Sequence, residues 1–168
     1  DRAACRLNYL IDHNGKTHEF QESLGYSFAI ISGIVTRKEA RVLAGNVHIS
    51  DYGIPSIWPD FERFSPQAPG RHNNIVWPFV NGFWAEAALR SGHADKFEFE
   101  LRNLAGLAVD KGQGMFYEIY NPYTGLPDGG WQIGRQWPSR KDQTWSATGF
   151  LRMVLSGVFG ISFSEKGM

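Results

Sequence analysis

The hydrophobic positions of this chain follow helical stripes, and the first stripes occur as a pair. The pair spans residues 21–33 and 37–48, with a break at Gly33 between them. Apolar residues recur every three or four positions in both segments, as one face of a helix requires. The expected core positions are Leu24, Phe28, Ile31 and Ile34 in the first segment and Ala40, Leu43, Ala44 and Val47 in the second. Thr36 followed by Glu39 has the pattern of a capping box, which predicts the start of the second helix.

A second helix pair and a single last helix follow. Pro78 suits the first position of a helix, where its missing N–H costs nothing, and the helix that it opens closes at Ser91 and Gly92. Further helices are expected over 94–110 and 143–159, the last capped by Ser139 or Asp142. The expected core positions are Val80, Phe83, Trp84, Ala87 and Ala88, then Phe97, Leu101, Leu104 and Leu107, then Ala147, Phe150, Leu151, Val154, Leu155 and Val158. Strand signals are weak and strongest at 115–120. The pattern therefore predicts an all-α fold of about five helices.

Two long loops, at 50–76 and 112–140, separate these helices, and loops of that length in a compact domain are usually functional. Polar and aromatic side chains collect just before or at the start of three helices. These residues are Glu22 before the first helix, then Trp58, His72, Asn73, Trp77 and Asn81, and finally Glu118, Trp131, Gln143 and Trp145. If the N-terminal ends of the three helices are neighbours, these side chains line one cleft.

Composition narrows the chemistry of such a cleft. The chain has 168 residues, with 17 Lys and Arg against 17 Asp and Glu, and it lacks the basic run that nucleic acid or an anionic membrane would attract. Its apolar runs are shorter than the roughly 20 residues that span a bilayer, and no signal-peptide pattern is visible. Cys5 is the single cysteine, and no pair of histidines has metal-ligand spacing. We expect a soluble protein without cofactor or metal, with nucleic acid and membrane excluded as partners and the compartment, cytoplasmic or periplasmic, left open.

The residue types favour a sugar as the ligand of the predicted cleft. Aromatic faces pack against the C–H groups of a pyranose, while amides, imidazoles and carboxylates bond its hydroxyls in fixed directions. Each residue also has a structural interpretation. Trp77 at a helical position is more often core, His72 in a loop is more often solvated, and Glu118 taken alone is more often a surface carboxylate.

Two long segments resemble one family of enzymes. HNNIVWPFVNGFWAEAALRSG (72–92) resembles a motif of six-hairpin glycoside hydrolases, and FYEIYNPYTGLPDGG with DQTWSATGFLRMVLSGVFGI (within 116–161) resembles their last conserved block. The resemblance covers 21–161 and is closest to glycoside hydrolase family 63 and to glycogen-debranching-like bacterial glycosidases. It implies part of an (α/α)6 toroid made of inner and outer helices. Residues 1–168 would then be a single segment, the C-terminal portion of the catalytic domain.

The same resemblance assigns site residues. Glu118 begins the segment Glu-Ile-Tyr-Asn-Pro, which matches the position of the general base that activates the attacking water in this family. Trp77, Asn81 and Trp145 match sugar-contacting positions, and His72 matches one more loosely. Asn74 stands where relatives often carry Gly. The full set expected to bind substrate is Trp58, His72, Asn73, Trp77, Asn81, Trp131, Gln143 and Trp145.

The general acid of these relatives, an Asp in a Trp-Asp or Gly-x-Asp segment, has no counterpart before Glu118, because Asp12, Asp51 and Asp60 stand in unlike contexts. Inverting hydrolysis needs both groups, about 6.5–9.5 Å apart. We therefore expect a piece of an exo-acting, inverting, α-glucosidase-like enzyme, inactive or incomplete alone, whose partners are an oligosaccharide or glycoside and the remaining hairpins of the barrel. The alternatives are a non-catalytic carbohydrate-binding or scaffold module and a self-contained helical domain with only an architectural likeness.

Overall fold

The computed structural model describes residues 10–11 and 14–162, so Cys5 and Asp12 lie outside the described residues. Within that part the protein has five α-helices, and two π-helical segments, η1 and η2, continue the fourth and the fifth. The helices are α1 (Ser23–Ile31), α2 (Arg37–Gly45), α3 (Pro78–Arg90), α4 (Ala94–Gly106) with η1 (Leu107–Lys111), and α5 (Thr144–Arg152) with η2 (Met153–Val158). The predicted all-α class is confirmed.

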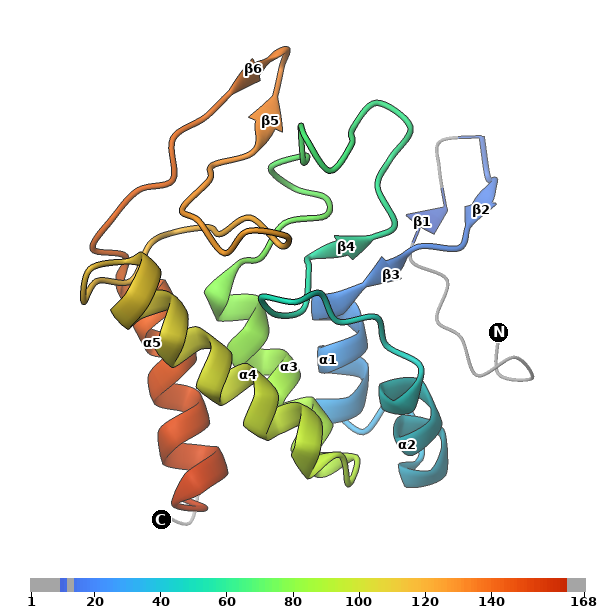
Figure 1. The fold of residues 1–168 in the computed structure, drawn as a ribbon. Helices are drawn as coiled ribbons and strands as arrows, with labels where there is room; N and C mark the ends of the chain where they lie inside the picture. Colours follow the sequence, from blue (N-terminus) through green and yellow to red (C-terminus); the bar gives the residue numbers. More distant parts are fainter. Residues whose placement is uncertain (1–9, 12–13, 163–168) are drawn as a thin grey trace.

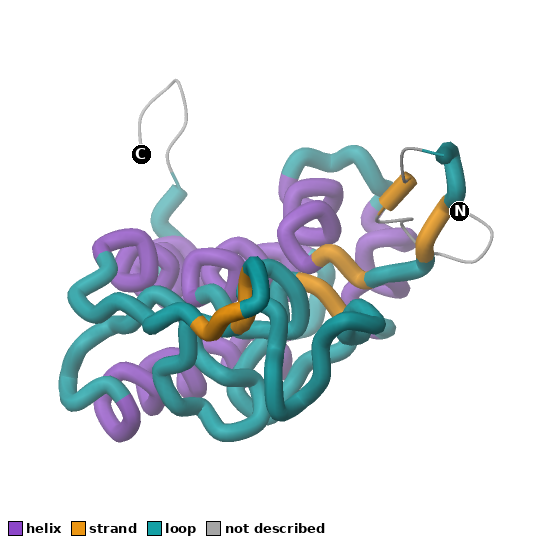
Figure 2. The backbone as a smooth tube through the Cα atoms, turned by 90° about the horizontal axis from the view of Figure 1, so that it is seen from above, coloured by secondary structure: helices purple, strands orange, loops and turns teal. Residues whose placement is uncertain are grey.

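The helices form two layers with the long loops gathered over one end (Figure 1). Helices α1, α3 and α5 lie side by side, and α2 and α4 pack on the outside, each against the helix that precedes it. Six strands of two residues each lie within the connecting segments and form three antiparallel pairs, seen from above in Figure 2. The strands are β1 (Leu10–Ile11), β2 (Thr17–His18), β3 (Gln21–Glu22), β4 (Ile57–Trp58), β5 (Trp131–Gln132) and β6 (Arg135–Gln136).

Local sequence signals explain where two of the helices begin. The capping box of α2 is confirmed, since the Glu39 backbone N–H donates to Thr36 Oγ1 (3.3 Å) and the Thr36 N–H donates to Glu39 Oε2 (2.8 Å). Pro78 is the first residue of α3, as predicted. The predicted cap of the last helix is wrong, because the N-cap of α5 is Gln143, which makes no side-chain capping bond.

Loop 112–140 also differs from expectation. Ser139, one of the two predicted caps, instead ties this loop together, donating to the Ile119 carbonyl (2.7 Å) and accepting from the Ile119 N–H (3.0 Å). Residues 115–120, where the weak strand signals were strongest, form no strand. Within this segment Tyr120 alone bonds by its backbone to the other long loop, exchanging both hydrogen bonds with Val76 (2.9 and 3.0 Å).

The buried faces agree with the predicted stripes in α2 and α4 and disagree in α1 and α5. Ala40, Leu43, Ala44 and Val47 are all buried, as are Phe97, Leu104 and Leu107, with Leu101 partly buried. In the first predicted stripe, however, Phe28 of α1 is 42% exposed and Ile34 just after α1 is 69% exposed, whereas the small Ser27 and Ala29 are buried. In α5 and η2, Leu151, Leu155 and Val158 are exposed while Ser146, Gly149 and Met153 are buried.

For α5 the reason is the close approach of α3 and α5. A Cβ atom added to Gly82 of α3 would lie 2.7 Å from the Gly149 Cα atom of α5, and one added to Gly149 would lie 2.5 Å from the Pro78 carbonyl oxygen. Helix axes this close exclude large side chains from the shared face, so the bulky apolar residues of α5 turn outward. Helix α3 is the centre of the fold, with Val80, Trp84, Ala87 and Ala88 buried and Phe83 partly exposed.

Among the helices within 14–162, none is both long and apolar enough to cross a membrane.

Gly82→Ala tests the close contact between α3 and α5. The added methyl group overpacks the interface, and we expect a loss of about 1–3 kcal/mol in the free energy of unfolding, measured by urea denaturation. Gly45→Ala in α2 is the matched control, because its Cβ would lie 3.6 Å from the His93 ring, an ordinary contact. The control is expected to be neutral or stabilising by up to about 1 kcal/mol. Equal stabilities for the two variants would contradict the packing.

Candidate active site

The first turns of α1, α3 and α5 meet at the loop end of the fold and enclose a cavity of about 410 Å³. Each of the three helices contributes to its wall, and the loop 50–76 supplies the rest. The lining residues are Glu22, Leu24, Ser56, Ile57, His72, Trp77, Phe79, Val80 and Trp145. The predicted convergence of three helix N-termini on one cleft is therefore confirmed.

Two tryptophans form the aromatic wall of this cleft. Trp77 is only 7% exposed, with its indole N–H donating to the Arg71 carbonyl oxygen (2.9 Å) and its ring stacked on His72 with 5.4 Å between centroids. Trp145 meets Trp77 edge-on (5.9 Å) and is 46% exposed. A fixed ring beside an exposed one suits a flat, partly apolar ligand.

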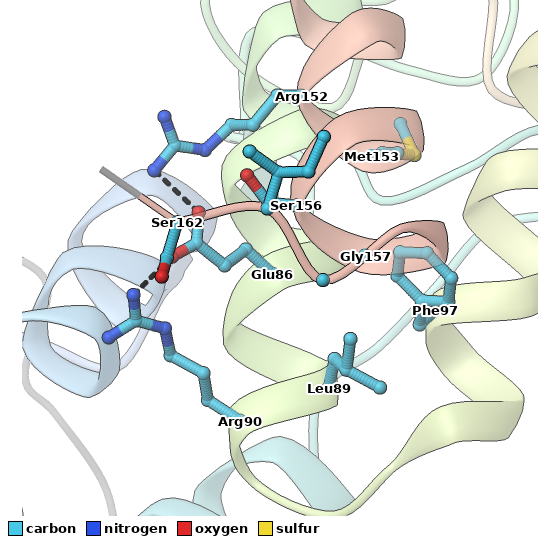
Figure 3. A pocket seen from close by; sticks show the side chains of 11 residues that line it. Glu86, Leu89, Arg90, Phe97, Arg152, Met153, Ser156, Gly157 and Ser162 are labelled. Carbon is cyan, nitrogen blue, oxygen red and sulfur yellow. Dashed lines mark ion pairs between the residues drawn. The ribbon is translucent and has the colours of Figure 1, made fainter. Parts of the chain in front are cut away.

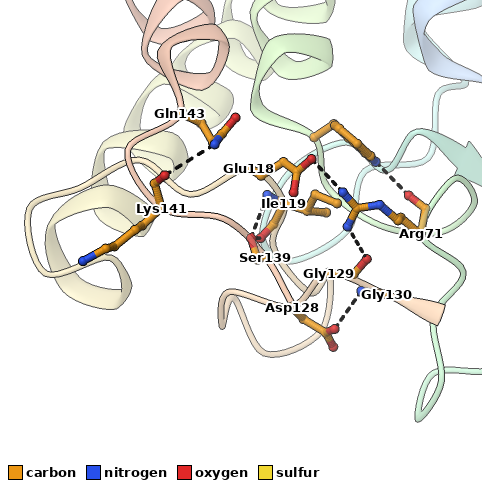
Figure 4. A network of polar contacts seen from close by, with 10 residues as sticks. Arg71, Glu118, Ile119, Asp128, Gly129, Gly130, Ser139, Lys141 and Gln143 are labelled. Carbon is orange, nitrogen blue, oxygen red and sulfur yellow. Dashed lines mark hydrogen bonds and ion pairs between the residues drawn. The ribbon is translucent and has the colours of Figure 1, made fainter. Parts of the chain in front are cut away.

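Glu118 is not among the lining residues of this cavity and is held by Arg71 (Figure 4), whose guanidinium lies over the Trp77 ring. Arg71 Nη2 lies 2.6 Å from Glu118 Oε1, and Nη1 donates to the Gly129 carbonyl oxygen (2.8 Å). The Glu118 backbone N–H donates to the Arg140 carbonyl oxygen (2.7 Å), which fixes the main chain as well. Glu118 is 7% exposed, and its second oxygen, Oε2, accepts no hydrogen bond from the described residues. One carboxylate oxygen is thus clamped and the other is left as a buried acceptor.

Arg71 is a site residue that the sequence did not predict. The residue stands directly before the 72–92 motif, but no spacing rule pairs it with a carboxylate 47 residues later. Its guanidinium also lies over the Trp77 ring, 5.4 Å from the centroid, so it contacts both the aromatic wall and Glu118. Arg71 therefore couples the two long loops at the site.

The His72 ring stacks on Trp77, and its surroundings favour the neutral imidazole. Burial lowers the pKa of His72 below its usual 6.5, the Arg71 cation lowers it further, and the Glu118 carboxylate opposes both effects. The imidazole is consequently uncharged at pH 7 and offers one donor and one acceptor.

Glu22 also lines the cleft. It was expected near the start of the first helix but was not among the residues expected to bind substrate. It is the N-cap of α1, and both carboxylate oxygens accept backbone N–H bonds, Oε1 from Leu24 (3.2 Å) and Oε2 from Gly25 (2.5 Å). Burial raises the pKa of Glu22, and the two backbone hydrogen bonds oppose that shift.

Two predicted ligand contacts are corrected, because Asn73 and Asn81 are fully buried. Asn73 Oδ1 accepts from the Phe61 N–H (2.7 Å) and its Nδ2 donates to the Pro59 carbonyl oxygen (3.2 Å), so the side chain shapes the loop. Asn81 Nδ2 donates to Glu100 Oε2 (2.6 Å) between α3 and α4. Neither residue is among those that line the cleft, although Asn81 Oδ1 is buried without a hydrogen-bond partner among the described residues.

Three other predicted contacts lie outside the lining of the cleft. Trp58 stacks on His48 with 4.4 Å between centroids, next to the lining residue Ile57. Trp131 lines a separate cavity of about 620 Å³ with Arg63 and Phe64. Gln143 points its amide back to the Lys141 carbonyl oxygen (3.4 Å). Of the predicted set, the structure brings His72, Trp77 and Trp145 together at the cleft, and their contact with a ligand stays a prediction.

Asn74 is buried where the two long loops meet. Its Nδ2 donates to Tyr123 Oη (2.7 Å) and to Asp60 Oδ2 (3.1 Å). Asn74 thus forms a polar tie between loops 50–76 and 112–140.

A second cavity, of about 320 Å³, lies at the opposite end of the helices (Figure 3). Glu86 pairs there with both Arg90 (2.6 Å) and Arg152 (2.5 Å). Because these ion pairs satisfy the carboxylate, this cavity presents no free acceptor comparable to Glu118 Oε2. Within residues 10–11 and 14–162, no three His, Cys, Asp or Glu side chains gather as metal ligands would.

Comparisons with known proteins place these features in a family. The family model for the mannosylglycerate hydrolase MGH1-like glycoside hydrolase domain matches residues 11–146. No curated protein gives a significant match.

Solved structures from Thermus thermophilus share the fold. An uncharacterized conserved protein has a TM-score of 0.67 at 25% identity over 92% of this chain and 35% of its own. The GH63 mannosylglycerate hydrolase in complex with Tris and D-glycerate has a TM-score of 0.68 at 23% identity, over 92% of this chain and 35% of its own. The same hydrolase in complex with glucose has a TM-score of 0.63 at 24% identity, over 90% and 33%. The chain therefore spans about a third of the length of these structures.

Arg71→Met tests the buried ion pair by stability alone. Removing one partner strands a buried charge, and we expect a loss of about 3–5 kcal/mol in the free energy of unfolding. Glu118→Gln in the Arg71→Met background removes that stranded charge, so the double variant is expected to be more stable than Arg71→Met, with a coupling energy of about 1–3 kcal/mol in a urea-denaturation cycle. Additive effects would contradict the pair.

Glu100→Gln tests the buried carboxyl beneath α3. Complete burial raises the pKa of Glu100 to about 7 from 4.5, although Asn81 and the Ile54 N–H donate to it. The folded state holds this proton up to pH 7, so the contribution to stability is full below pH 4.5 and is lost as pH rises through 7, by roughly 3 kcal/mol. In the wild type the urea midpoint should be lower at pH 8 than at pH 5. In Glu100→Gln this difference between the two midpoints should disappear. Glu98→Gln on the exposed side of α4 is the control, and a pH dependence equal in both variants would refute the assignment.

Proposed function

Because the chain belongs to the mannosylglycerate hydrolase MGH1-like glycoside hydrolase domain family, we propose that residues 1–168 form the C-terminal portion of the catalytic domain of an inverting glycosidase. The five helices are part of an (α/α)6 toroid, like that of the GH63 enzymes that share the fold. In this arrangement α1, α3 and α5 are inner helices and α2 and α4 are outer helices.

The single observation that supports a catalytic role is the asymmetric environment of the Glu118 carboxylate. Arg71 holds Oε1, while Oε2 is a buried acceptor without a donor among the described residues. A base in an inverting glycosidase needs one oriented oxygen that accepts a proton from water. Glu118 would take that proton while the water oxygen bonds to the anomeric carbon. The glycosidic C–O bond breaks, and an acid outside this chain protonates the leaving oxygen.

The substrate is an α-glycoside of a neutral hexose, cleaved from the end of the molecule. The aromatic pair Trp77 and Trp145 supports a sugar ring as the ligand, since both line the same cavity of about 410 Å³. The hydrolase from Thermus thermophilus has been crystallised with glucose and with D-glycerate. Small α-glucosides and mannosylglycerate are therefore the first substrates to assay.

The remaining hairpins of the barrel are the proposed partners of the exposed apolar faces. Phe28 and Ile34 on one flank and Leu151 and Leu155 on the other are 40–69% exposed, although each lies in or next to an inner helix. Apolar surface at both flanks of a helical layer is what neighbouring helix pairs would cover.

Glu118→Gln in the protein that carries this chain with the remaining hairpins tests the base. Losing the base removes about 10²–10⁴-fold of the rate, so kcat on the best α-glycoside should fall by that factor while substrate still binds. Glu98→Gln, an exposed carboxylate of α4, is the control and should keep wild-type turnover. Wild-type kcat in Glu118→Gln would refute the assignment. Sugar binding without turnover in the wild type would favour the carbohydrate-binding alternative.

A further inference from the structure

Glu22 occupies a wall of the cleft that the proposed catalysis does not use. It ends β3 and caps α1, and it lines the same cavity as Trp77 and Trp145. Strand β3 pairs with β4 so that Glu22 lies opposite Ile57, another lining residue. Glu22 and the aromatic wall therefore reach the cavity from different helices and face a common space.

The carboxylate of Glu22 is held in place before any ligand arrives. Leu24 and Gly25 each donate a backbone N–H to a different oxygen. A Cβ atom at Gly25 would lie 2.5 Å from Glu22 Oε2, so only glycine permits this approach. Because two hydrogen bonds and the pairing of β3 with β4 already fix Glu22, its side chain loses little conformational entropy when it binds a ligand.

Capping alone does not account for a glutamate here. The side chains that cap helices best are the short Ser, Thr, Asp and Asn, and a cap needs only one acceptor oxygen. An ionised carboxylate has about four acceptor positions, and the two backbone bonds leave about two of them. The remaining acceptor positions can bind a ligand that offers hydrogen-bond donors, such as sugar hydroxyls.

The charge of the residues that line the cavity further narrows the class of ligand that it can bind. Of its nine lining residues, Glu22 is the only one with a formal charge at pH 7, because the lowered pKa of His72 leaves that ring neutral. Arg71 is not among the lining residues and is paired with Glu118. Burial raises the pKa of Glu22, as is common for carboxylates at functional sites. The lining thus carries one negative charge, which attracts hydroxyl donors and repels an anionic ring.

We propose that Glu22 is a specificity-determining residue that accepts hydroxyl groups of a neutral hexose and excludes sugars that carry a carboxylate, such as uronic acids. The proposal rests on the proposed function, since it assumes that the cleft binds the terminal sugar. It extends that function by naming the residue that selects the class of sugar.

Binding of glucose and glucuronate at pH 7, measured by calorimetry on the intact protein, tests the proposal. The wild type should bind glucose at least about tenfold more tightly than glucuronate. Glu22→Gln should weaken glucose binding by about tenfold, the equivalent of one hydrogen bond to a charged group, and should narrow the preference by a similar factor. Glu22→Ser keeps a good N-cap but removes the carboxylate, and should show the same two changes.

Thr36→Ala is the matched control, because it deletes the N-cap of α2 away from the cavity and should leave both affinities unchanged. Wild-type affinities in Glu22→Gln and Glu22→Ser would overturn the proposal and leave Glu22 as a helix cap, as would a wild type that binds neither sugar. Glu118→Gln separates the two ideas, because turnover reports on the base while the ratio of the two affinities reports on Glu22.

Discussion

The close contact between α3 and α5 is the constraint on which the rest of the structure depends. Gly82 and Gly149 let the two backbones touch, and the buried Ser27 and Ala29 keep the inner face of α1 small. Three helices packed this tightly with their N-termini at the same end leave their first turns around one small space. The cleft is therefore a consequence of backbone packing, and side chains at the start of the three helices line it.

The loops complete the site because polar contacts join them. Arg71 connects Glu118, Gly129 and Trp77, and Asn74 connects Asp60 with Tyr123. These bonds hold the Glu118 carboxylate of one loop against Arg71 of the other loop, and Arg71 in turn lies over the Trp77 ring at the start of α3. A rigid helical layer with a cross-linked loop layer can keep a base oriented through its own hydrogen bonds.

Local signals in the sequence predicted where the helices lie. They did not predict which face of α1 and α5 is buried, or which residues far apart in the sequence pair with each other. Thr36 and Pro78 marked helix starts because capping and proline geometry act within one turn. Phe28 and Leu151 were expected in the core, but hydrophobicity cannot distinguish a face that meets α3 from one that other helices would cover. Asn81 suited a sugar by residue type, yet it bonds the buried Glu100. Arg71 and Glu118 are paired only by the fold, which no sequence spacing encodes.

A crystal structure of the intact protein with glucose tests the central claim, that the three helix N-termini form the sugar site, most directly. The account predicts one hexose in the cleft, its ring against Trp77 and Trp145, hydroxyls bonded to Glu22, and a water between the anomeric carbon and Glu118. A hexose bound instead beside Trp131 or in the cavity around Glu86, with the cleft empty, would contradict it.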